Sequence, residues 1–94
     1  MSQSDDFYTA ADAASDAVLA LLALETWAAP RKMSREKRGE IEAALINHRG
    51  QIYRTRVAID EMVRMRGAAL SPSVLSSRIK MMEDIRDDCL RLSK

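Results

Sequence analysis

The feature that most constrains this chain is a regular alternation of four- and three-residue steps between Ile41 and Met62. Residues spaced in this way return to one side of an α-helix, because each residue turns the helix by about 100°. The positions concerned are mostly apolar: Ile41, Leu45, His48, Ile52, Thr55, Ile59 and Met62. The pattern predicts one long amphipathic helix, which must pack its apolar side against other elements.

Gly50 lies within this pattern, and the "NHRG" that it completes resembles a helix end, with basic residues before a glycine. A helix that ends at Gly50 is therefore the alternative. The apolar stripe nevertheless crosses Gly50 without slipping, and no N-cap residue follows it. We predict a continuous helix, although glycine in a helix interior costs about 1 kcal/mol relative to alanine.

Serines that favour N-caps and prolines that stop or start helices delimit the remaining elements. These residues are Ser4, Pro30, Ser34, Ser71 and Pro72. Helices are expected over about residues 5–29, 34–66 and 72–92. Short connections make consecutive helices antiparallel neighbours, so the sequence predicts a single all-α domain over residues 1–94, a three-helix bundle without strands.

Each outer helix offers one apolar stripe to the core. The first is expected to bury Phe7, Ala11, Ala14, Val18, Leu21 and Leu22. The last is expected to bury Leu75, Ile79, Met82, Ile85, Cys89 and Leu92. The resulting core is thin, because a chain of this length buries only about 60–70% of its unfolded surface.

The chain has one cysteine, Cys89, and one histidine, His48, so it can build neither an internal disulfide nor a four-ligand zinc site. We expect no metal and no cofactor. The lone thiol and the lack of a basic signal-peptide start predict a cytoplasmic protein. The apolar run over residues 17–24 is too short to span a membrane. Oligomerisation is then the means by which so small a domain gains stability.

A second apolar line lies on the far side of the middle helix, about 150° from its core stripe. It consists of Ile46, Gly50, Tyr53 and Val57, and Arg49 and Arg56 lie beside it. Tyrosine and arginine often anchor interfaces, and glycine lets another backbone approach. In the first helix Leu19, Leu24 and Trp27 are expected to point away from the core. These residues are predicted to bind a protein partner, with ordinary solvated surface as the alternative.

No constellation of nucleophile, base and acid and no glycine-rich phosphate loop is present in the sequence. We therefore expect no enzyme. The sequence predicts a small regulator, inhibitor or adaptor that binds a larger protein through its helix faces and forms a homodimer.

DNA binding is the alternative, and it depends on "GAALSPSVLSSRIKMMED" at residues 67–84. This stretch resembles the turn and recognition helix of helix-turn-helix regulators of the Lrp/AsnC or MarR kind. The resemblance implies that the major groove would be contacted by Ser73, Ser76, Ser77, Arg78 and Lys80. The turn here is longer than in that pattern, and so is the preceding helix, which leaves DNA binding second to protein binding.

Overall fold

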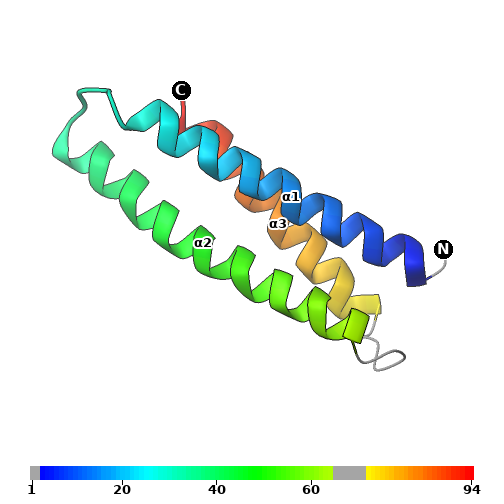
Figure 1. The fold of residues 1–94 in the computed structure, drawn as a ribbon. Coiled ribbons are helices and arrows are strands. Elements are labelled where there is room, and N and C mark those ends of the chain that lie inside the picture. The colour runs from blue at the N-terminus through cyan, green and yellow to red at the C-terminus, as the bar shows by residue number, and fades with distance from the viewer. Residues whose placement is uncertain (1–2, 65–71) are drawn as a thin grey trace.

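The computed structural model describes residues 3–64 and 72–94, and these residues form three α-helices and no strand. The helices are α1 (Gln3–Ala28), α2 (Arg35–Arg64) and α3 (Pro72–Leu92). Consecutive helices run in opposite directions along one long axis, and the molecule measures 49 × 20 × 18 Å (Figure 1). The all-α three-helix bundle predicted from the sequence is thereby confirmed.

Helix α2 continues through Gly50, as the unbroken apolar phase predicts. Its start is fixed by Ser34, whose side-chain oxygen accepts a hydrogen bond from the backbone N–H of Lys37 at 3.1 Å. The first backbone bond of the helix runs from the N–H of Arg38 to the carbonyl of Ser34 at 3.0 Å. Ser34 is therefore the N-cap, and it satisfies a donor that would otherwise lack a partner inside the helix.

The connection between α1 and α2 is held by a side chain of α2. The Arg38 guanidinium donates to the backbone carbonyls of Ala28, at 3.2 Å, and Arg31, at 2.6 Å. Carbonyls at a helix end lack donors within the helix, and a guanidinium carries several N–H groups. One arginine thus ties the end of α1 to the first turn of α2.

Packing within the bundle is uneven. Helix α1 packs most extensively on α3, less on α2, and the contact between α2 and α3 is the smallest. In Figure 1, α3 lies close behind α1 while α2 lies apart along the other side. The main core cluster accordingly joins the α1 residues Ala17, Leu21 and Leu24 to the α3 residues Met82 and Cys89. The stripes predicted for α2 and α3 are buried or partly buried wherever their side chains are described.

The stripe predicted for α1 is correct at Ala14 and Leu21, which are buried, but its centre is displaced. Leu22, expected in the core, is 51% exposed, whereas Leu24, expected to face a partner, is 0% exposed. The buried side of α1 consists mostly of alanines: Ala10, Ala14, Ala17, Ala20 and Ala28, together with Leu21 and Leu24. This side is rotated by about 80° from the predicted one. Alanines let another helix come close, so size alone is a poor guide to which side of α1 is buried.

Trp27 also differs from its predicted role. It is partly buried and packs against the main core cluster, and the Arg31 guanidinium carbon lies 4.6 Å from the centre of its ring. The arginine covers the indole in a cation–π contact. The side chain of Trp27 therefore packs mainly within its own chain and contributes little to the outer surface. Phe7 and Met62, also expected in the core, are not among the residues whose side chains the structure describes.

We predict that Leu24→Ala lowers the free energy of unfolding by about 2–5 kcal/mol, because it leaves a cavity in a packed core. The matched variant Leu22→Ala should cost less than about 1 kcal/mol, since half of that side chain is already in water. Urea unfolding followed by circular dichroism measures both. Equal losses would contradict the orientation of α1 described above.

Thr55 of α2 is 0% exposed, and its hydroxyl has no hydrogen-bond partner among the described residues. A buried hydroxyl without a partner carries a desolvation cost of about 1–3 kcal/mol. Thr55→Val keeps the shape and removes that cost, so thermal unfolding should show a gain of about 1 kcal/mol. A loss of stability in this variant would indicate that the hydroxyl is hydrogen-bonded in solution.

Candidate functional site

The outer surface between α1 and α2 is a shallow apolar groove. It has a volume of about 470 Å³, and its walls include Val18 and Leu22 of α1 and Tyr53 and Val57 of α2. Leu22 and Tyr53 are large and remain 51% and 69% exposed. The predicted contact residues Tyr53, Val57, Arg49 and Arg56 therefore do lie together, and Leu22 joins them from α1.

The predicted line on α2 continues from this groove over the outer side of the helix. Ile46 is 72% exposed, Gly50 and Val57 are partly buried, and Leu19 of α1 is 65% exposed in an adjoining depression beside Arg56. Large apolar side chains that remain this exposed on neighbouring helices are typical of interaction surfaces. We call Ile46, Gly50, Tyr53 and Val57 the α2 line.

The charges beside the α2 line are mainly positive. Arg49 pairs with Glu25, which links α2 to α1 across the groove. Arg56 lines the groove together with Asp60, one turn further along α2. Arg54 is exposed on the other side of the line. The apolar surface thus has a basic rim, a combination that interfaces use often.

Both glycines of α2, Gly39 and Gly50, are open to solvent on the side where a Cβ atom would point. An added Cβ at either position would meet no atom of the described residues within 4 Å. Packing within the described chain therefore does not require glycine there. Each glycine still lowers the stability of the helix by about 1 kcal/mol relative to alanine.

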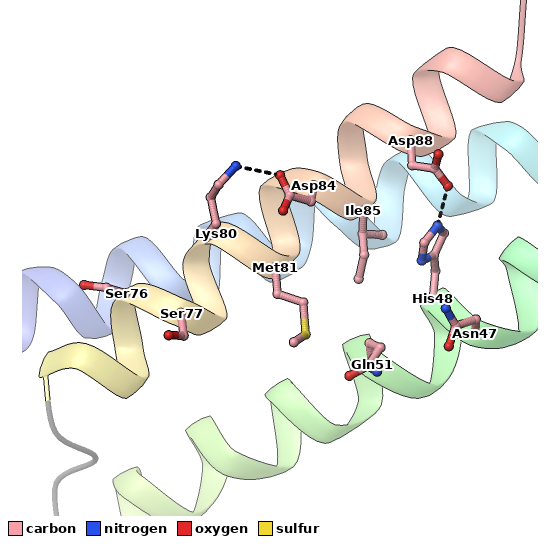
Figure 2. Close-up of a pocket in the computed structure, with 10 residues that line it drawn as sticks. All are labelled: Asn47, His48, Gln51, Ser76, Ser77, Lys80, Met81, Asp84, Ile85 and Asp88. Carbon is pink, nitrogen blue, oxygen red and sulfur yellow. Dashed lines mark hydrogen bonds and ion pairs between the residues drawn. The ribbon is translucent and has the colours of Figure 1, made fainter.

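A second hollow, with a volume of about 850 Å³, lies between α2 and α3 (Figure 2). Its lining is mostly polar: Asn47, His48, Gln51, Ser76, Ser77, Lys80, Met81, Asp84, Ile85 and Asp88. Met81 and Ile85 point from α3 toward α2 and give it an apolar floor, while Lys80 pairs with Asp84 on α3 at 2.8 Å. The sequence stripes did not reveal this cleft, because it exists only where α2 stands away from α3.

One end of the cleft is closed by a hydrogen bond between helices. Nε2 of His48 on α2 lies 2.7 Å from Oδ2 of Asp88 on α3, and Arg91 donates to the other oxygen of Asp88 at 2.7 Å. The hydrogen bond from His48 lowers the pKa of the Asp88 carboxyl, against the opposing effect of its burial. Arg91 also reaches Glu40 of α2 at 3.5 Å. These contacts join the two helices that otherwise touch least.

The serines and the His48–Asp88 pair lie at opposite ends of the cleft (Figure 2). Ser77 is eleven residues from Asp88 along α3, a distance of about 16 Å, so its hydroxyl cannot share a proton with the His48 pair. Burial raises the pKa of the neighbouring Cys89 thiol to about 11, which leaves it protonated and unreactive at neutral pH. No group of three or more metal-ligating side chains occurs among the described residues.

Three residues of the DNA-binding alternative, Ser76, Ser77 and Lys80, line the cleft between α2 and α3 together. Arg78 is partly buried, with its guanidinium 4.0 Å from the sulfur of Met81. The side chain of Ser73 lies outside the described side chains. Helices α2 and α3 run side by side instead of crossing at the steep angle of a helix-turn-helix pair (Figure 1).

Within residues 3–64 and 72–94, no helix has the length and apolar character needed to cross a membrane. No protein-family model matches the chain, and no curated protein or solved structure matches it either. The candidate site is therefore defined by its own geometry.

We predict that Asp88 makes the protein sensitive to acid. Its pKa is lower in the folded state than in the unfolded chain, so its stabilising effect is present at neutral pH and is lost as the pH falls below about 4. Asp88→Asn should unfold more easily at pH 7 and lose less further stability between about pH 4 and pH 2. Urea unfolding at each pH measures this, with the exposed Asp84→Asn as control. Parallel pH curves for Asp88→Asn and the unmodified protein would contradict it.

Proposed function

We propose that this protein is a small, non-enzymatic protein-interaction module of the cytoplasm, a homodimer that acts as a regulator, inhibitor or adaptor by binding a larger protein through its helix faces. The observation that carries the proposal is the group of large apolar side chains left exposed around the outer sides of α1 and α2. Leu19, Leu22, Ile46 and Tyr53 are each more than half exposed. Covering such groups is favourable by roughly 25 cal/mol per Å² of apolar surface.

The chemistry around these residues favours a protein as the binding partner. A tyrosine at the centre, aliphatic neighbours and an arginine rim resemble the composition of protein interfaces more than that of small-molecule sites. The groove between α1 and α2 is open and shallow, so an extended helix face fits it better than a compact ligand does. Occlusion or bridging through these faces would not require groups that perform chemistry.

A photo-crosslinking amino acid at position 53 tests this proposal in cells of the native host. It should yield a covalent product with another polypeptide chain, because Tyr53 lies at the centre of the exposed surface. The same amino acid at the exposed Glu83 of α3 is the matched control and should yield little product. The absence of any crosslinked polypeptide at position 53, in cells and with purified protein, would contradict the proposal.

A further inference from the structure

We infer that the α2 line binds the α2 line of a second copy of this chain, with the two α2 helices antiparallel and Tyr53 of each copy over Gly50 of the other. This inference rests on the proposed function and specifies its dimer: it names the occupant of the outer side of α2 and the register in which that occupant lies.

The four residues of the α2 line have the same spacing in both directions along the chain, with steps of 4, 3 and 4 residues. Gly39 and Arg64 extend the line by seven residues on either side, within a sector about 60° wide. Arg35 also lies in this sector and has no counterpart within α2. A two-fold axis that passes beside the midpoint of Gln51 and Ile52 lays the six residues from Gly39 to Arg64 onto themselves with one helix reversed. Self-complementarity of this kind is what a symmetric dimer requires.

In this register each glycine faces a large side chain. Tyr53 of one copy lies over Gly50 of the other, Ile46 over Val57, and Arg64 over Gly39. Both glycines are open to solvent within their own described chain and weaken the helix that contains them. A side chain that arrives from a second copy supplies the reason for glycine at these two positions. Small residues opposite large ones allow two helices to approach closely.

The exposed area of the chain agrees with an interface of ordinary size. The chain exposes 6374 Å², whereas a compact monomer of 10.5 kDa exposes about 5400 Å². The excess of about 970 Å² is close to the roughly 800 Å² that each partner contributes to a standard interface. A second copy alongside α2 would cover an area of this order.

The arginines beside the line give the dimer a distinctive salt dependence. Arg54 of each copy lies near Arg54 of the other at one edge of the contact, about five residues or 8 Å apart along the axis, and Arg49 is paired with Glu25 in its own chain. Repulsion between like charges is screened by salt. The dimer should therefore tighten as salt is added. An acidic partner on the same surface would bind more weakly under those conditions.

The two-fold axis also determines what remains free in the dimer. Because it stands at right angles to the plane of the α2 pair, both α1 helices lie on the same side of that plane. Leu19 and Leu22 of each copy then belong to one doubled surface. This surface is left for the larger protein of the proposed function.

Sedimentation equilibrium of the purified full chain tests association. The unmodified protein should form a dimer of twice 10.5 kDa, and its dissociation constant should fall with added salt. Gly50→Leu and Tyr53→Ala should each raise that constant at least about 30-fold. Gly50→Leu should also keep or increase helicity, which separates lost association from lost folding. Ala23→Leu, which adds the same side chain at an exposed position of α1, is the control.

Engineered cysteines test the register, in a Cys89→Ala background. The double variant Ile46→Cys/Val57→Cys should form a disulfide-linked dimer on oxidation, because each new thiol faces its counterpart in the other copy. Positions 46 and 57 of one helix are about 16 Å apart, so they cannot bridge within one chain. Ile46→Cys alone should not crosslink, since residue 46 of the other copy is also about 16 Å away along the helix axis. Efficient crosslinking by the single variant, or a dimer that Gly50→Leu leaves intact, would overturn the inference.

The outcomes distinguish this inference from the proposal on which it rests. A chain that stays monomeric at all concentrations, yet crosslinks to a different protein from position 53, overturns the symmetric dimer and leaves protein binding supported. A monomer without any crosslinked partner overturns both. A dimer with the predicted cysteine pairing supports the inference and the homodimer of the proposed function, and a crosslinking amino acid at position 19, outside the dimer contact, then tests binding of a larger protein.

Discussion

The close packing of the alanine side of α1 against α3 is the constraint on which the rest of this structure depends. Ala10, Ala14, Ala17 and Ala28 carry no long side chains, so the helix that faces them can approach closely. Helix α2 completes the core with the buried side chains of Ile41, Ile52 and Ile59. Helix α2 then lies along α1 and meets α3 least, held by Ile41 and Ile52 in the core and by ionic contacts at its edges.

This unequal packing explains why the surfaces of interest all involve α2. A long helix packed against a neighbour on one side only leaves its other sides uncovered, and here these sides form the apolar groove, the α2 line and the polar cleft. The interhelical pair of His48 and Asp88 stabilises a position of α2 that apolar packing with α3 does not determine. The elongated shape has a different cause: α2 alone, with 30 residues, is about 45 Å long, whereas the bundle is only 20 × 18 Å across.

Much of the candidate site could be predicted from the sequence, and the exceptions share one cause. Ile46, Tyr53 and Val57 were predicted at the surface because they lie opposite the apolar stripe of a long helix. Since only one side of that helix is continuously apolar, the side that faces the core is determined. In the run "AVLALLAL" of α1 almost every position is apolar, so periodicity cannot select a buried side. Choosing the larger residues placed Leu22 in the core and Leu24 outside, whereas close helix approach required the alanines inside. Their spacing was the signal that could have shown this.

The sequence by itself determined three helices, their limits to within about two residues where these fall among the described residues, the continuity of α2 through Gly50 and the outer position of the α2 line; the predicted end of α2 at residue 66 lies outside the described residues. These properties depend on local propensity, capping and the period of 3.6 residues, all of which are written into consecutive residues. Only the tertiary structure decided which side of α1 is buried, that Trp27 lies under Arg31, and that a cleft closed by His48 and Asp88 separates α2 from α3. These depend on the distances between helices, which the sizes of side chains on different segments set together.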